Sequence, residues 1–119
     1  MTEKEIQNEI LRTFGCRSDM IVFRMNVGAA RQGKQFVRFL RPGFADLMFL
    51  LSGGRTLFVE VKSKTGRQSK DQKTFQRIVE QLGFDYIIAR SVEDVDDALR
   101  TRFAIGWTPG EYDIEIERR

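Results

Sequence analysis

Two apolar segments on either side of a glycine-rich turn constrain the fold of this chain more than any other feature. Residues 45–51 (ADLMFLL) and 56–62 (TLFVEVK) have the length and composition of buried strands, and Ser52-Gly53-Gly54 separates them. Short turns that contain glycine join neighbouring antiparallel strands. We therefore expect a β-hairpin in the interior of the protein.

Alternation along the second strand of this hairpin separates apolar and charged side chains onto two faces. The apolar face, which we expect to point to a core, consists of Leu57, Val59 and Val61. Phe58, Glu60 and Lys62 share the opposite face. A three-residue turn would place Asp46 opposite Glu60 on that face, whereas a two-residue turn would need a bulge to restore the match. Either turn lets the two carboxylates converge at one edge of the sheet.

Two converging carboxylates repel each other, and a divalent cation relieves that repulsion. Mg²⁺ and Mn²⁺ prefer oxygen ligands and are commonly held by one or two carboxylates together with substrate phosphate. Asp46, Glu60 and the backbone carbonyl of Val61 are therefore the predicted metal ligands. Lys62 would orient the attacking water or stabilise charge on the phosphate.

The absence of histidine narrows the chemistry further. The chain has no histidine and one cysteine, Cys16, so it lacks a Ser-His or Cys-His dyad and a histidine-ligated zinc site. A metal-bound water of lowered pKa would replace the missing imidazole base.

A lone cysteine forms no internal disulfide, the N-terminal segment is polar, and no segment has the roughly 18–20 apolar residues of a membrane span. We expect a cytoplasmic protein with no membrane partner and no small-molecule cofactor.

The rest of the chain predicts a mixed β-sheet flanked by helices, in the order α-β-β-β-β-α-β-α. The further predicted elements are a helix over 2–14 closed by Gly15, strands over 21–27 and 35–40 paired as a hairpin around the loop 28–33, a helix from Ser69 to Leu82 closed by Gly83, a strand over 86–89, and a helix from Ser91 to about Arg102. The helix from Ser69 is indicated by a capping box with Gln72 and by a face shared by Gln72, Phe75, Val79 and Leu82. After Phe103 comes a tail in which Tyr112, Ile114 and Ile116 alternate, as in an edge strand or a dimer contact.

Basic residues are concentrated in the first two thirds of a chain whose net charge is +3. No acidic residue occurs from Met20 to Ala45, and acidic residues gather after Ser91. Such polarity indicates a positive face for a polyanion such as DNA, and the alternative is a solvated surface with scattered charge. The candidate DNA-binding residues are Arg24, Arg31, Lys34, Arg38, Arg41, Lys64, Arg67 and Lys70.

Two more polar residues are candidate active-site groups. Glu3 projects onto the apolar stripe of the first helix, where an unpaired charge is costly unless it has a role. The alternatives are that Glu3 only interacts with the helix dipole, or that Glu5 takes its place because the helix starts later. Gln72 is either the third residue of the capping box or an active-site group.

Several motifs of the sequence resemble those of a known family. Residues 42–46 (PGFAD) and 58–62 (FVEVK) look like the signature of the PD-(D/E)XK nuclease superfamily, and within it of the virus-type replication-repair nuclease (VRR-NUC) domain. Residues 3–7 (EKEIQ), residues 69–72 (SKDQ), Gly83 and Tyr86 are similar to further motifs of that family. The resemblance covers about residues 2–98 of a single predicted domain over 1–119, and it leaves the tail 103–119 without a role.

The resemblance implies a restriction-endonuclease-like core that hydrolyses DNA with Mg²⁺ or Mn²⁺. It implies that Asp46 and Glu60 bind the metal and that Lys62 is the catalytic lysine. Glu3 would lie near the metal, and Gln72 would position the catalytic groups or the DNA. Stand-alone, viral-type members are homodimers that cut branched DNA such as four-way (Holliday) junctions, so those partners are implied too. The alternatives are a non-catalytic nucleic-acid-binding module that keeps the nuclease fold, and a structural protein with an accidental Glu-x-Lys.

Overall fold

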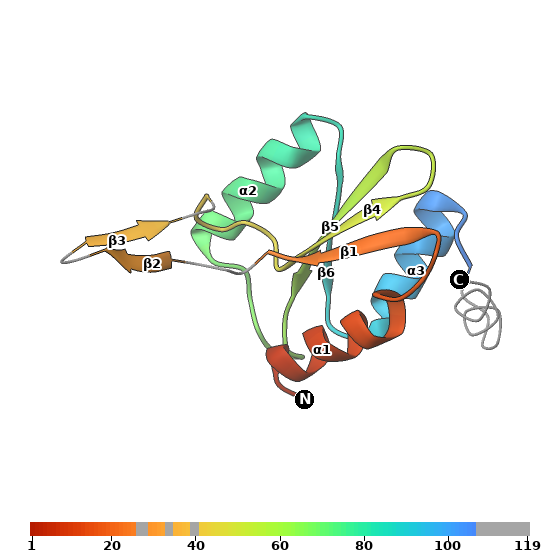
Figure 1. The fold of residues 1–119 in the computed structure, drawn as a ribbon, viewed down its shortest axis with the longest axis horizontal. Helices are drawn as coiled ribbons and strands as arrows, with labels where there is room; N and C mark the ends of the chain where they lie inside the picture. Colours follow the sequence, from red (N-terminus) through yellow and green to blue (C-terminus); the bar gives the residue numbers. More distant parts are fainter. Residues whose placement is uncertain (26–28, 33–34, 39–40, 107–119) are drawn as a thin grey trace.

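A mixed sheet of four strands, in the order β1-β4-β5-β6, forms the centre of the structure (Figure 1). The strands are β1 (Met20–Arg24), β4 (Leu47–Leu51), β5 (Arg55–Val61) and β6 (Asp85–Ala89). β4 runs antiparallel to β1 and β5, and β6 runs parallel to β5. The computed structural model describes residues 1–25, 29–32, 35–38 and 41–106. Within these residues, no helix combines the length and the apolar character needed to span a bilayer.

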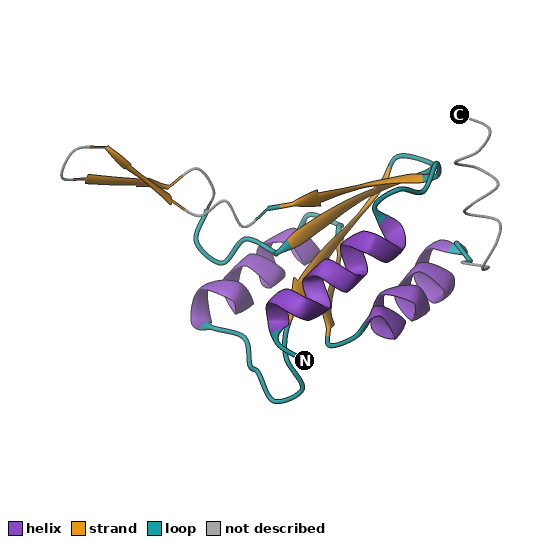
Figure 2. Ribbon diagram, turned by 60° about the horizontal axis from the view of Figure 1, so that its bottom comes forward, coloured by secondary structure: helices purple, strands orange, loops and turns teal. Residues whose placement is uncertain are grey.

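In the part of the chain that the structure describes, three helices cover the sheet: α1 (Glu3–Phe14), α2 (Lys70–Gln81) and α3 (Val92–Phe103) (Figure 2). α1 and α3 pack on the face that carries Leu57, Val59 and Val61, and the three side chains are fully buried there. α2 packs on the opposite face, where Phe75 meets Phe58 edge to face with ring centroids 5.5 Å apart. The expected mixed sheet flanked by helices is therefore confirmed, with a core on each side of β5.

The pairing of the strands before β4 differs from the sequence prediction. Residues 21–27 and 35–40 do not form a hairpin with each other, because β1 pairs with β4, from Met20 opposite Leu51 to Arg24 opposite Leu47. The predicted loop 28–33 instead contributes β2 (Ala29–Gln32), which pairs with β3 (Gln35–Arg38) in a separate two-stranded sheet. The element order thus gains one strand. Pairing with β4 buries Met20 in the main core, which a hairpin extending away from the body (Figure 1) would not do.

The helix boundaries follow the capping signals in the sequence. Thr2 caps α1 and Ser69 caps α2, each in a reciprocal capping box, with Glu5 and Gln72 respectively. Leu82 is an exception: it was predicted on the buried face of α2, but it is the C-cap residue of that helix and is 69% exposed. The predicted alternating segment with Tyr112, Ile114 and Ile116 lies outside the described residues.

Gly43 generates a prediction about how the loop before β4 packs on α2. Its φ is +81°, and a Cβ there would lie 2.3 Å from the backbone carbonyl of Asp71. Gly54 also has a positive φ, +73°, but a Cβ there would meet nothing within 4 Å. Left-handed backbone costs an alanine about 1–2 kcal/mol in both places, so Gly43→Ala should be the more destabilising of the two. Thermal unfolding of both variants measures this, and equal losses would contradict the close packing.

Candidate active site

The register of the β4–β5 hairpin places Asp46 next to Glu60. Leu51 pairs with Arg55 and Leu47 pairs with Val59, so the turn has three residues and the next position brings Asp46 opposite Glu60. Of the two turns that the sequence allowed, the structure therefore has the three-residue one, without a bulge. The Oδ2 atom of Asp46 accepts a hydrogen bond of 2.8 Å from the N–H of Val61. The sheet therefore fixes the position of Asp46, although the residue lies just before β4.

Glu60 is a buried carboxylate with partners on both oxygens. Its side chain is 1% exposed, and its Oε2 accepts 2.8 Å from Nε2 of Gln72 while its Oε1 accepts 3.4 Å from the hydroxyl of Tyr86. Burial raises the pKa of Glu60 to about 9, and the hydrogen bond and negative charge of Asp46 act in the same direction. Lys62 and Tyr86 lower this pKa and only partly compensate. The carboxyl is therefore protonated near neutral pH unless a cation takes the place of the proton.

Lys62 lies on the same face as Glu60, as the alternation of β5 predicts. Its Nζ is 3.9 Å from Oε2 of Glu60, and its side chain is buried. The N–H of Lys62 donates to the carbonyl of Ala89, which extends the pairing with β6 beyond the end of β5. A buried ammonium beside two carboxylates is well placed to stabilise negative charge on a substrate.

Gln72 makes contacts that fit both of the alternatives that the sequence offered. Its Oε1 accepts 2.8 Å from the N–H of Ser69, which completes the capping box of α2. Its Nε2 donates to Glu60 at 2.8 Å. One amide thus uses its oxygen to cap a helix and its nitrogen to hold a carboxylate, so the start of α2 is tied to the site.

Glu3 lies near the site but apart from its carboxylate pair. Its Oε2 accepts 3.4 Å from the N–H of Ser63, directly after Lys62. The alternative residue, Glu5, is occupied in the capping box with Thr2, so Glu3 is the carboxylate that reaches this loop. Glu3 is exposed rather than buried against the core. Among the described residues, no three Asp, Glu or Cys side chains gather closely enough to hold one ion.

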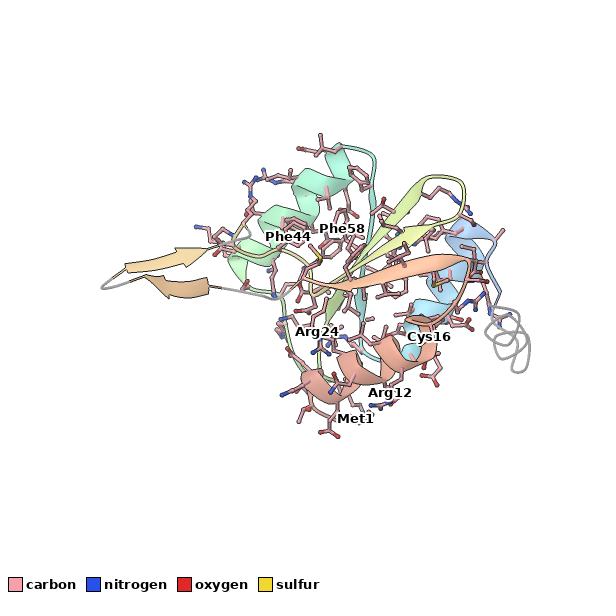
Figure 3. All side chains as sticks on the ribbon, in the orientation of Figure 1. Met1, Arg12, Cys16, Arg24, Phe44 and Phe58 are labelled. Carbon is pink, nitrogen blue, oxygen red and sulfur yellow. The ribbon has the colours of Figure 1, made fainter. Side chains whose placement is uncertain are left out.

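The candidate DNA-binding residues that the structure describes lie around the same end of the sheet. Lys64 and Arg67 lie in the loop between β5 and α2, and Lys70 is the first residue of α2. Arg41 lies in the loop that leads to Asp46. Arg24, labelled in Figure 3, lies at the end of β1 and donates to Oδ1 of Asn8 on α1. All five are exposed. The side chains of Arg31, Lys34 and Arg38 lie outside the described part of the structure.

Three residues at the site were given no role by the sequence reasoning. Tyr86 was noticed only as part of a family pattern, although its hydroxyl contacts Glu60. Gln68 and Arg90 had no signal at all, because a single Gln or Arg in a polar loop looks like a solvated residue. The Arg90 guanidinium donates to the carbonyls of Ser63 and Gly66, and so it holds the loop that follows Lys62.

The raised pKa of Glu60 predicts the pH dependence of stability of the metal-free protein. A carboxyl whose pKa rises on folding, here from 4.5 to about 9, stabilises the fold fully below the lower value and loses that contribution as pH rises through the higher one. Glu60→Gln has no carboxyl to titrate, so it lacks this loss of folding stability. For one proton the loss reaches about 1.4 kcal/mol per pH unit. The Tm of the variant minus that of the wild type, measured in EDTA, should therefore increase from pH 5 to pH 9. A difference that does not change with pH would argue against the buried, protonated carboxyl.

Comparisons with known proteins agree with this geometry. A family model described as the VRR-NUC domain matches residues 2–93. A solved structure described as a VRR_NUC domain is similar with a TM-score of 0.62 and 19% sequence identity, over 87% of this chain and 100% of that one, which supports the nuclease-like fold. No match is found among the curated proteins. Since the family model spans most of the sequence, the chain belongs to the VRR-NUC family of nuclease-type domains, whose substrate is nucleic acid.

Proposed function

We propose that this protein is a metal-dependent DNA endonuclease that hydrolyses phosphodiester bonds, selectively in branched DNA such as four-way junctions. The observation that carries the proposal is the strand register that sets Asp46 opposite the buried Glu60, beside the ammonium of Lys62. This arrangement joins two oxygen donors and a cation at one end of the sheet, where exposed basic residues can bind a phosphate backbone.

The residues present fit a Mg²⁺ or Mn²⁺ ion. Two carboxylates in contact, one of them buried, repel each other when both are ionised, and a divalent cation would offset both charges. The carbonyl oxygen of Val61 would be a third ligand for the same ion. The N–H of Val61 points to Asp46, and the C=O of a strand residue projects to the same side as its N–H. When bound, the ion would supply a water of lowered pKa, which a chain without histidine needs.

The other residues would act on the phosphate and on the geometry of the site. Lys62 would stabilise the charge that develops on the phosphate oxygens, or orient the attacking water. Gln72 would hold the carboxylate of Glu60 in place. Glu3 would hold the loop after Lys62 through the N–H of Ser63, which gives this first-helix carboxylate a role near the ion without requiring it to be a ligand.

The proposed DNA surface extends from the site toward the β2–β3 hairpin. The chain enters this hairpin after Met25, whose N–H donates to the carbonyl of Asp46, and leaves it before Arg41, in the loop that leads to Asp46. The hairpin extends away from the sheet (Figure 1). A two-stranded ribbon can enter the major groove of DNA, and Arg31, Lys34 and Arg38 belong to this segment of the sequence. We propose that it contacts DNA away from the cleaved bond and so contributes to structure selectivity.

The proposed partner, besides DNA, is a second copy of the chain. A four-way junction offers equivalent strands to two active sites, which a twofold dimer supplies. An exposed apolar surface is available on the part of the sheet that α2 leaves uncovered, with Ile21 57%, Phe23 41% and Leu50 38% exposed. The mass in solution, measured with and without junction DNA, tests this part of the proposal.

The Asp46→Asn variant distinguishes a nuclease from a non-catalytic nucleic-acid-binding module. Asparagine keeps an oxygen for the N–H of Val61 but removes the charge, so cleavage should fall by more than the roughly 10–100-fold typical of residues that only support a metal ligand. Binding of the same DNA in EDTA should be nearly unchanged. The measurement is cleavage of labelled duplex, flap and four-way junction DNA with Mg²⁺, with Mn²⁺ and with EDTA. A wild type that binds these DNAs but cuts none of them would favour the binding module.

Neutralising basic residues near the site tests the proposed DNA surface. Lys64→Gln and Lys70→Gln should each weaken binding to all sequences and reduce the slope of log K against log[salt] by roughly one. Arg100→Gln is a matched control, because Arg100 lies on α3 on the other face of the sheet and pairs with Asp96. Fluorescence anisotropy of labelled junction DNA between low and high salt gives the slopes. If Lys64→Gln and Lys70→Gln gave the same slope as the control Arg100→Gln, the DNA would bind to another part of the surface.

A further inference from the structure

A chain of side-chain hydrogen bonds leads from Glu60 to α2. The hydroxyl of Tyr86 lies 3.4 Å from Oε1 of Glu60 and 3.2 Å from Nε2 of Gln68. The same Nε2 lies 2.9 Å from Oε1 of Gln76. Tyr86 comes from β6, Gln68 from the loop before α2, and Gln76 from the middle of α2. Three segments of the chain are therefore linked in series, and the hydroxyl of Tyr86 connects them to one oxygen of the Glu60 carboxylate on β5.

The donor and acceptor properties of these groups give the chain a direction. An amide nitrogen donates and does not accept, so Gln68 donates one proton to Tyr86 and the other to Gln76. The hydroxyl of Tyr86 has a single proton, and with its oxygen accepting from Gln68 that proton is directed to Glu60. Both protons of the Gln68 amide are thus used.

We propose that Tyr86 and Gln68 are positioning residues that hold the Glu60 carboxylate in the orientation in which it binds the metal ion. Gln72 holds Oε2 and Tyr86 holds Oε1, so the plane of the carboxylate is fixed from two sides, and it faces Asp46. Hydrogen bonds from neighbouring groups orient metal-binding carboxylates and tune their affinity. This inference rests on the metal site of the proposed function and adds the residues that pre-form it.

The ring and the hydroxyl of Tyr86 have separable roles. The ring belongs to the apolar cluster under α2 and lies 6.3 Å from the ring of Phe75, between centroids. A phenylalanine would fill the same space and keep this packing. Only the hydroxyl reaches Glu60, so Tyr86→Phe removes the hydrogen bond and leaves the core nearly intact. Gln68, which is partly exposed in a loop, offers a second variant that does not involve the core.

The experiment compares Tyr86→Phe, Gln68→Leu and the double variant with the wild type. Four quantities are measured on each protein: Mn²⁺ affinity by calorimetry without DNA, affinity for junction DNA in EDTA, kcat of junction cleavage, and Tm. We expect Tyr86→Phe to weaken Mn²⁺ binding about 10–100-fold, with a parallel loss of kcat and nearly unchanged DNA affinity. Gln68→Leu should have a smaller effect in the wild type and none in the Tyr86→Phe background, because it acts through the hydroxyl. Gln81→Leu, an exposed glutamine in the last turn of α2, is the matched control and should behave as the wild type.

The outcomes separate this inference from the function on which it rests. Wild-type Mn²⁺ affinity and kcat in Tyr86→Phe, with or without a lower Tm, would overturn the positioning role. So would additive effects of the two substitutions, since they would mean that Gln68 acts independently of Tyr86. If the wild type bound no Mn²⁺, or Asp46→Asn bound it equally well, the proposed metal site itself would be wrong and the positioning role would fail with it.

Discussion

The burial of the Glu60 carboxylate beside Asp46 is the constraint on which the rest of the structure depends. A carboxylate without water is costly unless hydrogen bonds or opposite charges compensate it. Here the compensation comes from several parts of the chain at once: Gln72 from α2, Tyr86 from β6 and Lys62, directly after β5. Asp46 is held in turn by the N–H of Val61. An arrangement that remains costly without a cation is consistent with a site built to bind one.

The start of α2 connects the stability of the fold to the geometry of the site. The amide of Gln72 caps the helix and also contacts Glu60, so the helix cannot shift without moving the carboxylate. On its other side the helix start meets Gly43, which has no Cβ and can therefore approach the backbone of Asp71 closely. The Pro-Gly segment before Asp46 thus has a packing role: it lets the loop that carries Asp46 pass next to the helix that carries Gln72.

Prediction from the sequence succeeded where the information was local. A turn of three residues, one of the two that the sequence allowed, and the alternation along β5 were enough to place Asp46, Glu60 and Lys62 together, and the capping box with Gln72 located the start of α2. The predicted pairing of β1 was wrong, because alternation identifies a strand but does not show which strand it pairs with. The nearest later strand in sequence was chosen, whereas the burial of Met20 requires β4 as the neighbour. Glu3 was placed on the correct side of its helix but wrongly expected to face the core.

The sequence by itself determined which carboxylates and which lysine meet, because strand periodicity and turn length are properties of adjacent residues. Only the tertiary structure decided what surrounds them. Tyr86 reaches Glu60 because β6 pairs with β5, and Gln68, in the loop before α2, reaches the hydroxyl of Tyr86. Arg90 reaches the carbonyls of the loop after Lys62 in the same way. These contacts join residues far apart in the chain, through side chains whose positions depend on how helices and strands pack together. No local pattern encodes that packing, so these supporting residues became visible only in the folded protein.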